Sequence, residues 1–222
     1  MQLFSTLKCS VWVAALCLCA QAQTPPAKEA PANESKGLPA RVSPTEYQAH
    51  AQVGTATIAA EFTGHSLATP QGTFSNEDYV VVETGFFGPD GARLKVSAED
   101  FSLRVNGKKS ALTPQPFGLI ASSLKDPEWE PPAEKKSKTS MGGGGGEKGG
   151  AGDPPPAPPK MSFPERRAME QKVQKATLPE GDRALPVAGL IFFQYGGRTK
   201  GIKSLELIYN GPAGKATLAL QP

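Results

Sequence analysis

The stretch EDYVVVETGFFGPDGARLKVSAEDFSLRVNGKK, residues 77–109, gives the strongest fold signal in this 222-residue chain. Residues 79–82 are apolar at every position, which is typical of a central strand covered on both faces of its sheet. After a Gly-Pro-Asp-Gly turn, residues 101–105 alternate apolar with polar side chains, the pattern of a half-buried strand. The stretch therefore predicts consecutive strands of an antiparallel sheet, and it indicates a scaffold more than a chemistry.

The dipeptide Asn106-Gly107 ends the second of these strands. Both central positions of a type I′ turn need a positive φ angle, which Asn and Gly tolerate best. The dipeptide therefore predicts a hairpin whose second arm spans residues 108–112, before Pro114 ends it.

Several flanking segments repeat the strand pattern. The clearest are residues 55–62, 190–195, 205–209 and 216–220, residues 45–53 are a weaker candidate, and residues 63–65 and 69–72 have turn and loop signals. About seven or eight short strands separated by turns predict an all-β fold, an Ig-like antiparallel β-sandwich. We expect residues 42–125 and 179–222 to form one sandwich, because neither part has enough strands to cover a sheet alone.

Residues 126–161 have a different composition from the strands on either side. They include five consecutive glycines at positions 142–146 and the sequence DPPPAPP at positions 153–159. Such a segment cannot bury enough apolar surface to offset the entropy lost on ordering. We therefore expect a long disordered insertion, rich in Gly, Pro and Lys, between the two parts of the sandwich.

Residues 162–178 predict one amphipathic helix. Ser162 and Glu165 have the spacing of a capping box, in which each side chain bonds the backbone N–H of the other residue. Met169, Val173 and Ala176 recur at helical spacing and form a narrow apolar stripe.

The N-terminus predicts export. Lys8, the apolar residues 11–19 and the small-x-small sequence Ala20-Gln21-Ala22 match a cleaved signal peptide over residues 1–22, with a disordered leader over residues 23–41. The apolar segment is shorter than the roughly 20 residues of a transmembrane helix. We therefore expect a periplasmic or extracellular protein.

The three cysteines of the chain, Cys9, Cys17 and Cys19, all lie within the predicted signal peptide. Cys17 and Cys19 each follow a leucine where a lipobox has a small residue, so we do not expect lipid anchoring. The exported chain would then have neither a disulfide nor a thiol nucleophile.

Three segments resemble a known family. The sequences KVSAEDFSL (residues 95–103), GLIFF (189–193) and SLELIY (204–209) resemble the strand core and closing strands of telokin-like, immunoglobulin-like extracytoplasmic bacterial domains of unknown function. This chain departs from them in lacking a cysteine pair and in containing the long insertion. The resemblance implies a fold and a compartment; it implies no activity and no catalytic residues.

The charge distribution argues against a nucleic-acid groove on the folded part. The formal net charge is +3, and residues 133–175 alone contain nine Lys or Arg and five Asp or Glu. Because the predicted basic character belongs to one internal segment, we expect no nucleic-acid partner.

An acidic cluster surrounds Trp129, the only tryptophan outside the predicted signal peptide. Asp126 and Glu128 lie beside it in the sequence, and an aromatic side chain with paired carboxylates is one way to bind and cleave a sugar. The alternative is that Trp129 packs the start of the insertion against the edge of the sandwich. We favour this structural role, because no second aromatic residue or acid pair has a comparable context.

The insertion and the helix together form a second candidate surface. Lys135, Lys136 and Lys138 could attract an anionic envelope surface, while Met169 and Val173 dock on another envelope protein. The alternative, which we favour, is a solvated loop with the helix packed on its own domain.

We find no pattern that predicts catalysis. The two histidines, His50 and His65, lack the Gly-x-Ser-x-Gly sequence of a hydrolase and the spacing of a metal site. We therefore predict no catalytic residue, cofactor or metal, and an exported interaction or assembly module of the bacterial envelope. The rival hypotheses are an extracytoplasmic carbohydrate-active or other hydrolytic enzyme and a small-ligand carrier.

Overall fold

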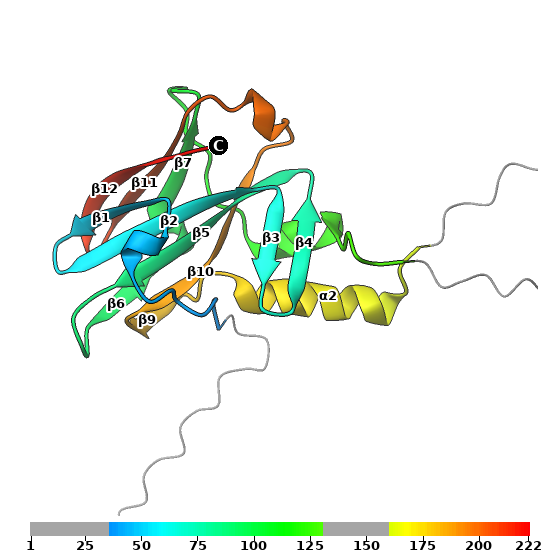
Figure 1. The fold of residues 1–222 in the computed structure, drawn as a ribbon, viewed down its shortest axis with the longest axis horizontal. Helices are drawn as coiled ribbons and strands as arrows, with labels where there is room; N and C mark the ends of the chain where they lie inside the picture. The colour runs from blue at the N-terminus through cyan, green and yellow to red at the C-terminus, as the bar shows by residue number, and fades with distance from the viewer. Residues whose placement is uncertain (1–35, 131–159) are drawn as a thin grey trace, which may run out of the picture. The chain divides into compact units, whose positions relative to one another are not determined.

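Strand β5 (Tyr79–Phe87) lies in the middle of the structure (Figure 1). The computed structural model describes residues 36–130 and 160–222. In it, β5 is part of a four-stranded antiparallel sheet of order β1-β2-β5-β10. The other strands of this sheet are β1 (Ala49–Val53), β2 (Ala56–Gly64) and β10 (Val187–Gln194).

A second antiparallel sheet packs on one face of the first. Its order is β12-β11-β7, and its strands are β7 (Phe101–Val105), β11 (Leu205–Gly211) and β12 (Gly214–Leu220). The main core between the two sheets includes Ile58, Val82, Phe86, Phe193, Leu103, Leu207 and Tyr209. The predicted all-β, antiparallel sandwich is therefore confirmed, and strands from before and after residues 131–159 lie in the same sheets.

The other face of the first sheet is covered by a helix and a small sheet (Figure 1). These are α2 (Phe163–Ala176) and the sheet of order β3-β4-β8, formed by β3 (Ser66–Thr69), β4 (Gly72–Asn76) and β8 (Leu124–Lys125). A second core lies here and contains Leu67, Phe74, Val81, Ile120, Val173, Leu190 and Phe192. Strands β5 and β10 are thus buried on both faces, which explains their uninterrupted apolar runs.

The remaining elements are short. Strands β6 (Arg93–Val96) and β9 (Gly181–Ala184) form a two-stranded ribbon, and α1 (Phe117–Ile120) is a single helical turn. The 3-10 helices are η1 (Pro44–Glu46), η2 (Ala98–Asp100), η3 (Ala121–Ser123) and η4 (Thr199–Gly201). Within the described residues, no helix is both long enough and apolar enough to cross a membrane.

Helix α2 begins at the predicted capping box of Ser162 and Glu165. Its apolar stripe faces the sheet, so that Met169 is 5% exposed and Val173 is 0% exposed. The hypothesis that these two side chains dock on a partner is therefore wrong for this structure, because the protein's own second core already buries them.

The predicted hairpin at Asn106-Gly107 is only partly correct. Both residues have positive φ angles, 54° and 64°, as the turn requires. Its second arm is not a strand, because Leu112 alone pairs back with Leu103 while β7 takes β11 as its strand partner. Residues 108–110 are all exposed, so they gain no apolar burial by extending the arm.

Two other expectations need correction. The loop expected around residues 69–72 is the turn of the β3–β4 hairpin, whose strands are too short for a clear alternating pattern. Residues 36–41, predicted as the end of a disordered leader, lie against the first sheet, where the Leu38 N–H donates to the Ala188 carbonyl at 2.8 Å. One buried backbone bond of this kind is not visible in composition.

The docking of α2 is testable by truncating its stripe. We expect Met169→Ala to lower the free energy of unfolding by about 2–5 kcal/mol, because it leaves a cavity in the second core. Exposed Gln171 is the matched control, and Gln171→Ala should change stability by less than about 0.5 kcal/mol. Urea unfolding measures both values, and equal effects of the two substitutions would show that the helix is not docked.

Candidate functional site

The outer edge of β10 has no complete neighbouring strand. Strand β10 pairs with β5 on one side only. On the other side, three short segments each bond one carbonyl of β10. Leu38 bonds Ala188 at 2.8 Å, Leu178 bonds Leu190 at 3.0 Å and Gln115 bonds Phe192 at 2.8 Å.

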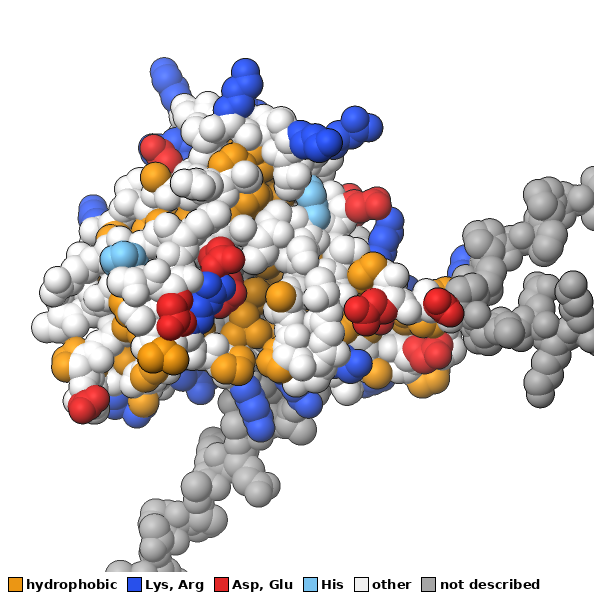
Figure 2. Space-filling view, in the orientation of Figure 1, with side chains coloured by type: hydrophobic (Ala, Val, Ile, Leu, Met, Phe, Trp, Pro, Cys, Tyr) orange, Lys and Arg blue, Asp and Glu red, His pale blue; other side chains and the backbone are white. Residues whose placement is uncertain are grey.

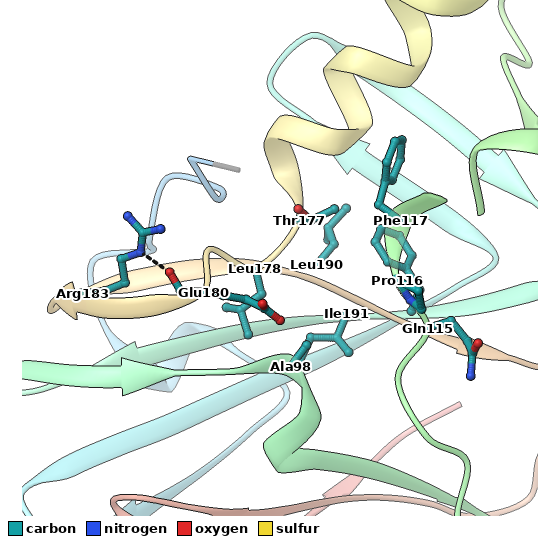
Figure 3. A pocket seen from close by; sticks show the side chains of 11 residues that line it. Ala98, Gln115, Pro116, Phe117, Thr177, Leu178, Glu180, Arg183, Leu190 and Ile191 are labelled. Carbon is teal, nitrogen blue, oxygen red and sulfur yellow. Dashed lines mark hydrogen bonds between the residues drawn. The ribbon is translucent and has the colours of Figure 1, made fainter. Parts of the chain in front are cut away.

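A recess of about 370 Å³ lies between the last two of these segments (Figure 3). We call it the β10 recess. Its floor is the edge of β10 at residues 190–192, and its walls are Thr177 and Leu178 on one side and residues 115–117 on the other. Ala98, Glu180 and Arg183 complete its lining.

The β10 recess is apolar inside and polar at its rim. Figure 3 shows Glu180 and Arg183 on one side of it and Gln115 on the other. Arg183 is held in place by a bond from its Nε to the Glu180 carbonyl at 2.8 Å. The lining therefore offers apolar contact with a few polar groups that can orient a bound molecule, as small binding sites usually do.

One backbone donor also faces this edge. The carbonyl of Phe192 bonds outward to Gln115, and in an antiparallel strand the N–H and carbonyl of a residue point to the same side. The Phe192 N–H therefore points away from β5, toward the edge where the recess lies. An extended peptide that approached this edge could accept that N–H and place one side chain in the recess.

Sequence reasoning missed the β10 recess. Residues 190–192 were correctly predicted to be a buried strand, but the walls come from segments about 75 and 12 residues away along the chain. The segment TPQPF at residues 113–117, with its two prolines, was the only available signal, and it predicts an extended segment without showing what that segment faces.

A polar cluster lies on β2 and β5, in register with Leu190 of β10. Glu61 and Glu83 lie directly opposite each other on β2 and β5, an arrangement that is unfavourable for like charges. Arg41 lies between them, with 2.5 Å to Glu61 and 2.9 Å to Glu83, and its guanidinium stacks 4.3 Å from the centre of the Tyr47 ring.

The electrostatics of the cluster indicate a structural clamp. Burial works to lower the pKa of Arg41, but hydrogen bonds and charges from Glu83 and Glu61 outweigh it, so the pKa is raised and the arginine stays charged. Burial, together with the charge of Glu83, raises the pKa of Tyr47 to about 12. Arg41 thus fastens the N-terminal segment to the sheet, and both carboxylates are engaged in holding it.

The carboxylate that interacts with Trp129 is neither Asp126 nor Glu128, the two acidic residues beside it in the sequence. Asp126 accepts the N–H of Glu128 at 3.0 Å and its carbonyl accepts the N–H of Trp129, so it shapes a local turn. The carboxylate next to the indole belongs to Glu165 of α2. Hydrogen bonds from Ser162, and to a smaller extent from Trp129, lower the pKa of Glu165.

Trp129 therefore connects the start of the insertion to the start of α2 and is half-buried there. Sequence reasoning assigned Glu165 only to the helix cap. The predicted contributions of Lys135, Lys136 and Lys138 fall outside the described residues.

The two histidines have separate environments. His50 is exposed on β1. Nδ1 of His65 lies 2.8 Å from the Asn76 carbonyl and 2.9 Å from the Tyr79 carbonyl, and Nε2 lies 3.0 Å from the Gly197 carbonyl. His65 thus links three chain segments. Across residues 36–130 and 160–222 there is no group of three His, Cys, Asp or Glu side chains that could hold a metal ion.

Comparison with known proteins adds no relative. No protein-family model matches this chain, and no curated protein and no solved structure shows significant similarity to it.

Removing the hydroxyl group should have opposite effects on stability at Tyr47, beside the clamp, and at Tyr209, in the main core. The buried Tyr47 hydroxyl makes no hydrogen bond of good geometry with another described residue, so Tyr47→Phe should raise the free energy of unfolding by up to about 1 kcal/mol at neutral pH. The Tyr209 hydroxyl accepts the Ala213 N–H at 3.4 Å, so Tyr209→Phe should lower it by about 0.5–1.5 kcal/mol. Urea unfolding of both variants checks the difference.

Tyr47 should also make the free energy of unfolding depend on pH in the alkaline range. An unfolded tyrosine ionises near pH 10, while folded Tyr47 ionises near 12, so this group favours the unfolded state increasingly as pH rises from about 10 to 12. Tyr47→Phe should lose less stability over that range than the parent protein. An equal loss in both proteins would contradict the buried position of Tyr47.

The contact between Trp129 and Glu165 is visible by fluorescence. Because Glu165 has a lowered pKa, the emission of Trp129 should change only below the ordinary pH range of a glutamate, while far-UV circular dichroism stays constant. Glu165→Gln should abolish the change. Glu77, whose pKa is lowered by Lys125, is the matched control, and a loss of the change in Glu77→Gln would contradict the assignment.

Proposed function

We propose that this protein is an exported, non-catalytic, Ig-like interaction module of the bacterial envelope. The signal-peptide pattern of residues 1–22 supports export, and the resemblance of the strand segments to telokin-like extracytoplasmic domains supports the compartment. The antiparallel sandwich fits an Ig-like arrangement, and the Gly-, Pro- and Lys-rich composition of residues 126–161 supports the expected insertion between its two parts.

The observation that supports an interaction role is the β10 recess. We propose that it binds an extended apolar segment of another envelope protein. The exposed edge of a sheet recognises peptides through backbone hydrogen bonds, and pockets for alternate side chains add specificity. Here the outward Phe192 N–H supplies the backbone donor, and the apolar space of about 370 Å³ beside Leu178 and Leu190 supplies the pocket.

The short length of the open edge limits what can bind. The carbonyls of Leu190 and Phe192 are already bonded to Leu178 and Gln115, so a partner cannot add a long strand there. The partner segment therefore cannot form a continuous ladder of hydrogen bonds with β10. It can place one anchor side chain in the recess, between the carbonyls of Leu190 and Phe192 that are already bonded. We therefore expect weak, transient binding by a short segment.

A small-ligand carrier is the second candidate. The volume of the β10 recess lies within the range of small-molecule sites, and its lining is mainly apolar. Native mass spectrometry of the exported protein separates the two proposals, because a carrier would retain a small molecule that Ala98→Phe displaces.

Filling the recess tests the proposal directly. Ala98 lines the recess, so Ala98→Phe should occupy it, while Ala219→Phe adds the same bulk on the exposed side of β12. A photo-crosslinking residue at Gln115 should capture a partner in cells, and peptide mapping should place the crosslink in an extended apolar segment. Capture should be lost in Ala98→Phe and kept in Ala219→Phe.

The amide of Phe192 provides the decisive readout. A synthetic peptide with the mapped sequence should shift the Phe192 N–H resonance of the parent protein downfield, because its carbonyl accepts that N–H. It should bind Ala98→Phe at least tenfold more weakly. Equal binding to both proteins, or binding without any shift of the Phe192 amide, would refute the recess as the site.

A further inference from the structure

Two loops that are far apart in the sequence meet at one end of the sandwich. One is the turn after β7, residues 106–111, and the other is the connection from β10 to β11, residues 196–204. Together they contain five basic residues and no acidic residue: Lys108, Lys109, Arg198, Lys200 and Lys203. We call this surface the basic tip.

Asn106 holds the two loops together. Its backbone N–H donates to the Ser204 carbonyl at 2.8 Å, and its side-chain amide donates to the Gly201 carbonyl at 3.0 Å. Its side-chain oxygen accepts the backbone N–H of Lys203 at 2.6 Å. The cations of both loops are therefore presented on one fixed surface.

The five cations are free to act on a partner. All five residues are exposed, and none forms a salt bridge with another described residue. Figure 2 shows Lys and Arg side chains projecting from the top of the molecule, where Figure 1 places the β7 turn and the β10–β11 connection. Like charges gathered in this way repel one another, and an anionic partner relieves that repulsion.

The character of the basic tip indicates what kind of partner it fits. The large apolar side chains that are exposed on the described chain are Val42, Leu119 and Phe163, and none of them belongs to the tip. A protein interface normally has an apolar or aromatic centre, which the tip lacks. A projecting surface that carries only cations fits a flat anionic layer, which all five side chains can approach at once.

We propose that the basic tip binds the anionic headgroups of a phospholipid membrane. Juxtamembrane clusters of four to eight Lys or Arg residues bind such surfaces by electrostatic attraction, which decays within a Debye length of about 8–10 Å. The tip has no exposed large apolar side chain to insert among the acyl chains. The contact is therefore peripheral and sensitive to salt.

Vesicle binding by the full chain, as exported by a bacterial host, tests the proposal. Vesicles with 30 mol% phosphatidylglycerol should bind it, pure phosphatidylcholine vesicles should bind it far less, and raising salt from about 50 mM to 500 mM should release it. Each removed cation should weaken binding about fivefold. Lys108→Gln with Lys109→Gln, or Arg198→Gln with Lys200→Gln, should therefore weaken it about 25-fold.

The matched control removes two charges elsewhere. Lys175 and Lys215 are exposed, and they lie on α2 and at the opposite end of β11 and β12 from the tip. Lys175→Gln with Lys215→Gln should change vesicle affinity less than threefold. All six substituted side chains are exposed, so thermal unfolding should confirm that each double variant keeps the fold.

Three results would overturn the proposal. An equal loss in the control variant would assign the effect to net charge. Equal binding to both kinds of vesicle would exclude headgroup recognition. Binding to soluble polyphosphate that depends on the tip, without binding to anionic vesicles, would assign the tip to a soluble polyanion. Ala98→Phe should leave vesicle binding unchanged, so failure of the peptide-binding proposal and failure of this one are distinguishable.

Discussion

Burial of β5 on both faces is the constraint on which the rest of the structure depends. A strand whose side chains are apolar in both directions must be covered on both sides, because leaving either face in water would forfeit its hydrophobic stabilisation. The sheet β12-β11-β7 covers one face, and α2 with the β3–β4 hairpin covers part of the other. The segment fastened by Arg41 covers the remaining polar part of that second face. The two-sided burial of β5 thus requires three layers: its own sheet and one covering layer on each face.

The same constraint produces the β10 recess. Strand β10 is also buried on both faces, but it lies at the edge of its sheet, so its outward backbone groups need partners other than a strand. Leu38, Leu178 and Gln115 each supply one N–H, and each belongs to a different short segment of the chain. Three short segments that each bond one residue of β10 leave gaps between them along the strand edge. The β10 recess is the gap between the segments of Leu178 and Gln115.

The sequence predicts the elements better than the sites, for reasons that particular residues make clear. Residues 79–82, the stripe of α2 and its capping box are local patterns, and each was confirmed. The second arm after Gly107 was wrong, because the local turn signal was correct but only Leu112 gained a partner. The basic tip leaves no local pattern, because Lys109 and Arg198 are far apart in the sequence and only the hydrogen bonds of Asn106 bring their loops together in space. Sites built by tertiary contacts leave no signal at any single position.

The two proposed surfaces are connected by one strand. Strand β10 forms the floor of the recess at Phe192 and leads, six residues later, to Arg198 of the basic tip. Six extended residues span at most about 20 Å, so the recess lies no farther than that from the tip along the chain. If the tip rests on lipid headgroups, then the recess is held close above the membrane surface. A segment bound there would belong to a protein that is itself at the membrane. Membrane attachment of both partners would raise their effective concentration, so that even a recess with a single anchor position could bind its partner.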